Sequence, residues 1–142
     1  MKKEIYEEEL SVINAVYGIG RQSRMKDLVA FQDNWDGRGA KALLPESMAL
    51  FMRFIERFGK VADDLSLFLS HEGHLLISWS FWVNDPAIQR RGGLTRRVDI
   101  EFTKTNILYF RYGMDKGDTT VAPDGDEIKA LVERYRSHHL TE

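Results

Sequence analysis

The four histidines are the residues whose type and spacing come nearest to a metal site. His71 and His74 flank Glu72 at an expected hairpin turn, where two imidazoles and a carboxylate can hold a metal ion. A turn tip of this composition is polar without any ligand, and we favour that interpretation. His138 and His139 lie near the C-terminus, and adjacent residues on a helix do not face the same way. The histidines therefore predict no metal centre.

The second candidate for chemistry is the acidic pair Asp99 and Glu101. Two positions apart on an expected strand, they share one face, as two magnesium ligands would. A nuclease of the restriction-enzyme type needs a lysine two positions after the glutamate. Lys104 follows Glu101 by three positions and points to the opposite face. We therefore expect the two acids to form ion pairs on the sheet, with Arg97 on the same face or across strands with Arg111.

Other catalytic patterns do not occur in the sequence. It contains no phosphate-binding glycine loop followed by Lys-Ser/Thr, no dinucleotide-binding glycine motif and no H-E-x-x-H. The lack of cysteine removes disulfides, thiolate zinc sites and cysteine nucleophiles. Sequence order does not decide a Ser-His-Asp triad, but histidines at a turn tip and a tail offer no buried base. We expect no catalytic activity, no metal and no cofactor.

The strongest local charge is a run of arginines around Gly92-Gly93. Residues 90 to 97 carry four arginines and no acid, which favours contact with phosphate, nucleic acid or an acidic protein surface. Aromatic residues on the wetter sheet face extend this patch, a combination found both in protein interfaces and in base-stacking surfaces. The residues expected to contact a partner are Arg90, Arg91, Arg96, Arg97, Arg111, Tyr109 and Trp82. A solvated loop without a partner is the alternative.

The stretch N-W-D-G-R-G-A, Asn34 to Ala40, predicts a folded loop with one large side chain. In one interpretation Trp35 anchors the loop by burial against the helices, and Asp36 accepts backbone N–H bonds of the glycine turn. The glycines then supply positive φ angles. In the other, Asp36 and Arg38 are exposed and bind a ligand or partner. The two interpretations are compatible, because loops held by a rigid anchor often bind.

This loop, followed by a Pro45-Glu46 helix start, resembles a group of small uncharacterised bacterial and phage proteins with an N-W-D-G-x-G-A motif. The resemblance covers residues 28–58 and the order of the elements behind them. It implies a loop that leads into a helix and then into short strands, and it implies no activity. Leu44 stands where the group often has Ser or Thr, so no side-chain cap is expected for this helix.

Periodicity along the chain predicts the elements that position these residues. Apolar spacings of three and four predict helices at residues 3–17, 21–33 and 45–58. Alternation with period two predicts strands at residues 65–70, 75–82, 97–102 and 107–112. Asp124 with Glu127 predicts a capping box for a C-terminal helix after Pro123. Together these predict one α+β domain, residues 1–142, with N-terminal helices, a four-stranded antiparallel meander sheet and a C-terminal helix.

Composition bounds the class of protein. With 142 residues, 43% hydrophobic and 30% charged residues, the chain suits one globular domain. A net charge of −2 gives no general attraction to nucleic acid or anionic membranes. No apolar run is long enough for a membrane span, and the N-terminus is not a secretory signal. We expect a cytoplasmic protein that does not bind membranes.

From these features we predict a non-catalytic protein-binding module. We expect an inhibitor, immunity or anti-defence protein of a bacterium, phage or mobile element, bound to a nuclease, toxin or defence component. The acidic segment 115–127 makes the chain bipolar, which fits protein docking better than duplex binding. The alternatives are a nucleic-acid-binding module that uses Arg90 to Arg97 and, less favoured, a metal-dependent enzyme. Pairing of two copies through an exposed sheet edge also stays open.

Overall fold

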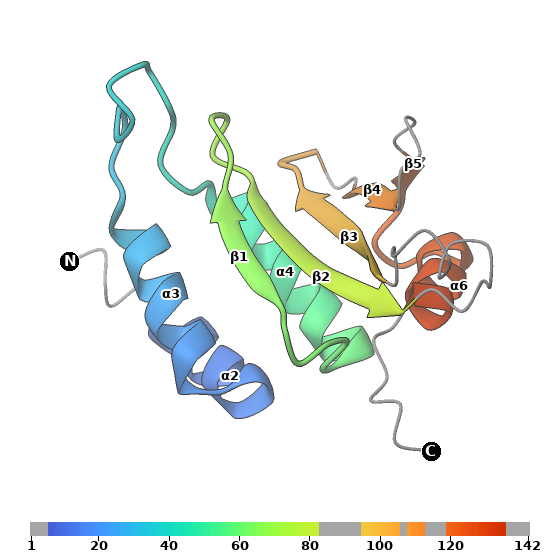
Figure 1. The fold of residues 1–142 in the computed structure, drawn as a ribbon. Coiled ribbons are helices and arrows are strands. Elements are labelled where there is room, and N and C mark those ends of the chain that lie inside the picture. The colour runs from blue at the N-terminus through green and yellow to red at the C-terminus, as the bar shows by residue number, and fades with distance from the viewer. Residues whose placement is uncertain (1–5, 83–94, 106–107, 113–118, 136–142) are drawn as a thin grey trace.

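A computed structural model describes residues 6–82, 95–105, 108–112 and 119–135 (Figure 1). Their elements, in chain order, are α2 (Glu7–Tyr17), α3 (Ile19–Ala30), α4 (Pro45–Phe58), β1 (Ser66–Leu69), β2 (Leu75–Trp82), β3 (Thr95–Phe102), β4 (Leu108–Tyr112), β5 (Thr119–Val121) and α6 (Asp126–Tyr135). The architecture is α+β, with N-terminal helices, an antiparallel sheet and a C-terminal helix, as the sequence predicts. Within the described residues, no helix has the length and apolar character needed to cross a membrane.

The sheet is a meander of five strands in the order β1-β2-β3-β4-β5, and every neighbouring pair is antiparallel. The four predicted strands are present. The fifth strand, β5, pairs with β4 and was not predicted. At three residues it is too short to show an alternating pattern, and the sequence around it is dominated by acidic side chains.

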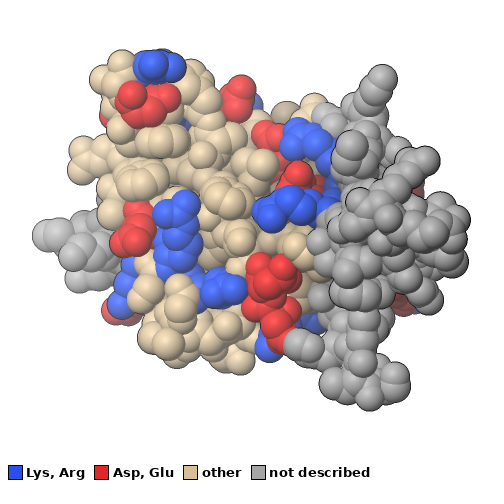
Figure 2. Space-filling view, in the orientation of Figure 1, with Lys and Arg blue, Asp and Glu red and all other residues tan. Residues whose placement is uncertain are grey.

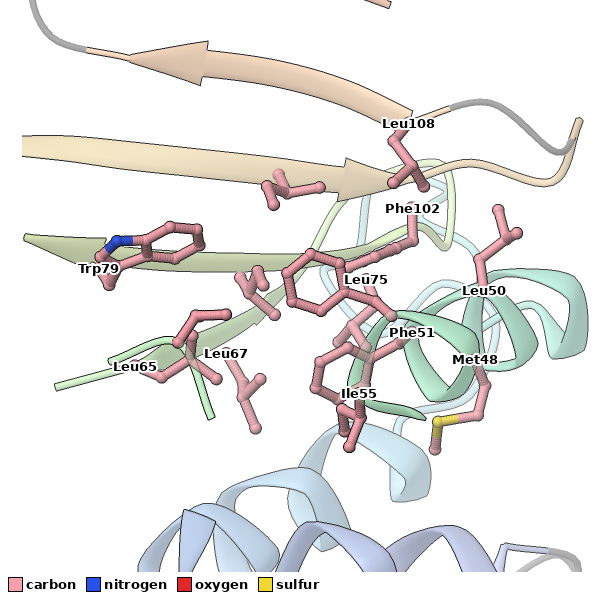
Figure 3. Packing of buried hydrophobic residues seen from close by; sticks show 14 of the residues in the cluster. Met48, Leu50, Phe51, Ile55, Leu65, Leu67, Leu75, Trp79, Phe102 and Leu108 are labelled. Atoms are coloured by element: carbon pink, nitrogen blue, oxygen red, sulfur yellow. The ribbon is translucent and has the colours of Figure 1, made fainter. Parts of the chain in front are cut away.

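Helix α4 covers the inner face of the sheet. Pro45 occupies the first helical turn, where its missing N–H is harmless, and Leu44 makes no side-chain cap, as expected. Gly59 ends the helix with a φ of 65°. Figure 3 shows Phe51 of α4 turned toward the sheet, where Phe51 and Phe102 have ring centroids 5.3 Å apart. The core therefore lies between α4 and the strands.

One buried hydroxyl joins α4 to two strands. Ser47 is fully buried, and its Oγ donates to the Phe102 carbonyl at 2.5 Å. The same Oγ accepts the Leu75 backbone N–H at 2.7 Å. Both groups lie at the ends of β2 and β3 nearest the β1–β2 turn. Ser47 thus satisfies two buried backbone groups and fixes the start of α4 against the sheet.

Helices α2 and α3 form a hairpin beside β1 (Figure 1). Gly18, with a φ of 99°, separates the two helices, which confirms the expected break. From α3, Arg21 donates to the Leu65 carbonyl, and Arg24 donates to the Leu67 carbonyl at 3.0 Å. Leu67 belongs to β1 and Leu65 directly precedes it, so α3 lies along the outer edge of β1.

The C-terminal helix closes the other end of the core. It begins at Asp126, so the predicted cap at Asp124 is wrong. The Asp124 carboxylate instead pairs with Arg53 of α4. The indole of Trp79 on β2 donates to the Tyr135 carbonyl at 2.8 Å, which ties the last turn of α6 to the inner face of the sheet.

Candidate functional site

The outer face of the sheet lies opposite α4 and is the candidate docking surface, called here the open face. Strand register places its residues in rows that run across the strands. The first row is Phe68, Leu76, Glu101, Tyr109 and Thr120; the second is Ser66, Ser78, Asp99 and Arg111; the third is Ser80 and Arg97. In Figure 1 the sheet lies in front of α4, and Figure 2 shows basic, acidic and uncharged side chains interleaved on this face.

Two aromatic side chains on the open face are exposed to solvent. Phe68 on β1 is 43% exposed, and Tyr109 on β4 is 36% exposed. The register puts both in the first row, with Leu76 and Glu101 between them. The guanidinium of Arg24, on α3, lies 6.0 Å from the centroid of the Phe68 ring on the edge strand β1. The open face therefore presents exposed aromatic side chains that are surrounded by polar and charged ones.

Both arginines of the open face bond to side chains on neighbouring strands. Arg111 Nη2 donates to Glu101 Oε1 at 3.3 Å, which confirms the predicted cross-strand ion pair. The pairing is diagonal, because Asp99 rather than Glu101 lies directly opposite Arg111 in the register. Arg97 Nη2 donates to Ser78 Oγ at 2.5 Å. In these rows two arginines stand beside two carboxylates, so their formal charges balance.

A histidine joins this network from the β1–β2 turn. His74 Nδ1 lies 2.6 Å from Glu101 Oε2, and both side chains are mostly buried, at 14% and 13% exposed. Sequence reasoning missed this contact. The sequence gives a faint signal for it, because pairing β2 with β3 brings the residue before Leu75 close to the end of β3, where Glu101 lies.

The predicted partner-binding residues do not all fall on this face within the described structure. Arg97, Tyr109 and Arg111 do. Arg96 lies opposite Phe81 and Trp82 lies opposite Thr95 in the β2–β3 register, and of these residues only the backbone is described. Arg90 and Arg91, in the predicted basic loop, lie outside the described residues. The structure therefore describes only the part of the predicted basic patch that lies on the sheet, beside acidic side chains.

The Trp35 loop, residues 31–44, holds its shape through side-chain bonds to its own backbone. Asp36 Oδ1 accepts the N–H groups of Arg38 at 2.8 Å and Ala40 at 3.0 Å, as predicted. Asn34 Oδ1 accepts the N–H of Gly39 at 2.7 Å. The glycines at positions 37 and 39 have φ angles of 73° and 86°, which confirms the expected use of their conformational freedom.

The predicted burial of Trp35 against the helices is wrong in part. Its side chain is 37% exposed. One face of the indole stacks on Phe31, with ring centroids 5.0 Å apart and an interplanar angle of 21°. Its Nε1 donates to the Lys41 carbonyl at 2.9 Å. Trp35 thus closes the loop upon itself and leaves part of its ring exposed.

The β1–β2 turn packs against this loop. The Lys41 N–H donates to the His71 carbonyl at 2.8 Å, and the Leu44 N–H donates to the Gly73 carbonyl at 3.0 Å. His71 Nε2 lies 2.9 Å from the Arg38 carbonyl and 3.8 Å from Asp36 Oδ2. His71 therefore contacts the Trp35 loop, whereas the other histidine of the turn contacts the open face.

The carboxylate of Asp36 makes the loop sensitive to acid. The Arg38 N–H bond lowers the pKa of Asp36 below its ordinary value of 3.8, with further lowering by the Ala40 N–H and by His71. Because the folded-state pKa lies below the unfolded-state value, the stabilising effect is complete above the unfolded value and is lost as pH falls through the folded value. We expect the Arg38 and Ala40 amides to lose hydrogen-exchange protection and shift in NMR spectra as pH falls below about 4.

The Asp36→Asn variant is the control for this acid response. The asparagine oxygen still accepts N–H bonds but does not titrate in this range. The two amide signals are therefore expected to stay constant in the variant over the same pH range. Equal pH dependence in both proteins would show that another group controls the loop.

Two hollows among the helices, each of about 470 Å³, lie away from the open face. The first, between α2 and α3, is lined by Glu7, Leu10, Gln22, Lys26, Val29 and Ala30. The second, between α2 and α4, is lined by Glu8, Glu9, Val12, Val16, Met52, Ile55 and Glu56. Neither includes a residue for which the sequence predicts a function.

Comparison with protein-family models, curated proteins and solved structures finds no match for this chain.

Proposed function

We propose that this chain is a non-catalytic protein-binding module whose open face docks on a partner protein. The observation that carries the proposal is the pair of exposed aromatics, Phe68 and Tyr109, on the face of the sheet opposite α4. Aromatic residues and arginine are enriched at protein interfaces, where a few such side chains supply most of the binding energy. The neighbouring polar groups would form the rim.

The charge of the open face supports a protein partner over a nucleic acid. Binding to a phosphate backbone relies on unbalanced positive charge. Here Arg111 is bonded to Glu101, and Asp99 lies directly opposite Arg111. A surface with both signs suits a partner that also carries both signs, because such pairs fix the register of an interface.

The partner that we propose is a nuclease, toxin or defence component, which the module would inhibit by covering its functional surface. On this proposal the chain acts as an inhibitor, immunity or anti-defence protein in the cytoplasm of a bacterium or a phage-infected cell. Two features support it: the sequence lacks the common catalytic motifs, and its charge is divided between basic residues 90–97 and acidic residues 115–127.

The test begins with affinity capture from a lysate of the organism that carries the gene, at moderate salt and after nuclease treatment. We expect a single stoichiometric protein. With that partner purified, Phe68→Ala and Tyr109→Ala are each expected to weaken binding by about 2 kcal/mol or more, roughly thirtyfold in Kd. The matched control is Ile19→Ala, which removes a 66% exposed apolar side chain from α3 and is expected to leave Kd unchanged.

Two outcomes would contradict the proposal. Unchanged affinity in the Phe68→Ala/Tyr109→Ala double variant, with its circular dichroism intact, would exclude the open face as the interface. Recovery of nucleic acid whose binding falls steeply with salt would favour the alternative, a nucleic-acid-binding module.

A further inference from the structure

Three possible metal ligands converge where the β1–β2 turn meets β3. Glu72, His74 and Glu101 each offer one ligand atom, and these atoms lie within 4.8 Å of one another. We propose that they form a binding site for a divalent transition-metal ion of the zinc class. The argument for this site does not rest on the proposed protein-binding function, although Glu101 also belongs to the open face. The proposal departs from the sequence-based expectation that the chain holds no metal.

The central pair already faces the position that the ion would take. His74 Nδ1 and Glu101 Oε2 are 2.6 Å apart, a separation that a shared proton explains. Zinc bonds of about 2.0–2.2 Å in tetrahedral geometry place two ligand atoms roughly 3.3 Å apart. A small rotation of the two side chains reaches that spacing. Coordination through Nδ1 requires the ring proton to lie on Nε2, so the ion would take the place of the hydrogen bond between the two side chains.

Other bonds orient these ligands. Arg111 donates to Glu101 Oε1 and leaves Oε2 directed at the imidazole. Such bonds from the surrounding shell commonly hold metal-binding carboxylates in position. The backbone N–H of His74 donates to Ser70 Oγ at 3.0 Å, which fixes the turn beneath the imidazole.

The third proposed ligand, Glu72, approaches the site from the surface. Glu72 is exposed at the tip of the turn, and only its backbone N–H is bonded to Ser70 Oγ, at 3.2 Å, among the contacts described. Two carboxylates and one neutral imidazole balance the charge of a divalent ion. Three protein ligands leave a fourth position for water, as in zinc sites that stay open. The imidazole nitrogen favours zinc, copper or nickel over magnesium or calcium.

The other histidine of the turn supplies a matched control. His71 lies three positions from His74, but its Nε2 is directed at the Arg38 carbonyl. Its replacement removes an imidazole from the same turn without removing a proposed ligand. His138 and His139 are replaced together in a second control, because a neighbouring pair of histidines can bind zinc weakly.

The experiment is isothermal titration of the full chain with zinc chloride. We expect one zinc ion per chain and a melting temperature that rises with zinc concentration. His74→Gln and Glu101→Gln are expected to abolish this binding. Glu72→Gln, which changes only an exposed side chain and so leaves the fold intact, is expected to weaken it at least about tenfold.

The controls decide the outcome. His71→Gln and the His138→Gln/His139→Gln double variant are expected to bind zinc as the unchanged protein does. Loss of zinc binding in either control variant would show that the site lies elsewhere and would overturn the proposal. Unchanged affinity in Glu72→Gln and His74→Gln, or no heat and no melting shift with zinc, would also overturn it.

Discussion

Replacing Trp79 with alanine is expected to lower the free energy of unfolding by about 3–5 kcal/mol, the range for a large buried aromatic. The side chain is 1% exposed and lies on the inner face of β2 (Figure 3). Its indole also donates to the Tyr135 carbonyl at the end of α6. The variant loses both the packing and this link. Urea denaturation followed by circular dichroism measures the change.

Trp79→Phe separates these two contributions. Phenylalanine keeps most of the apolar area but has no N–H, so the Tyr135 carbonyl loses its donor. Leaving a buried acceptor unsatisfied costs about 1–3 kcal/mol, and we expect a loss in that range for this variant. A loss below about 1 kcal/mol for Trp79→Ala would show that α6 and β2 are held together by other contacts.

The second large effect is expected at Gly73, in the turn before β2. Its φ is +85°, and a Cβ at this position would lie 2.4 Å from the Ala42 carbonyl oxygen. That oxygen belongs to the backbone of the Trp35 loop and cannot rotate away. The left-handed conformation alone costs an L-residue about 1–2 kcal/mol. We expect Gly73→Ala to lower the free energy of unfolding by more than this amount, because the turn and the loop must also separate. Urea denaturation measures the loss.

Gly39 provides a close control for this effect. Its φ is +86°, and no heavy atom lies within 4 Å of a Cβ built there. Gly39→Ala should therefore show the conformational cost alone, and the difference between the variants measures the contact between turn and loop. Hydrogen exchange at Lys41 and Leu44, whose amides bond to the turn, should increase only in Gly73→Ala. Equal losses in both variants would refute the steric argument.

The sequence predicts the elements whose signals are local. The two-residue alternation in the long strands reports a half-buried sheet directly, and Pro45 and Gly59 mark the ends of α4 because their backbone preferences act within single residues. The same holds for Asp36, which bonds to amides two and four residues ahead. Such contacts need no knowledge of the tertiary structure.

What the sequence could not predict depends on partners distant in the chain. The Asp124 carboxylate pairs with Arg53, 71 residues away, and α6 begins two residues after Asp124. Trp35 is an exception, because its stacking partner Phe31 is only four residues away; the sequence pattern did not show that this contact replaces burial against the helices. The contact between His74 and Glu101 appears only once the register of β2 and β3 is known.

The arginines of α3 have a consequence for how the protein behaves at high concentration. An edge strand with free carbonyls is a template for another chain, and Arg21 and Arg24 occupy two carbonyls beside β1. Guanidinium groups stay charged at all ordinary pH values, so acid or base does not remove this protection. The protection depends instead on the α2–α3 hairpin remaining docked. Conditions that detach this hairpin while the sheet stays folded would expose the edge of β1 to pairing with another chain and so to fibril-like association. The docked helices therefore protect the protein against aggregation through this edge.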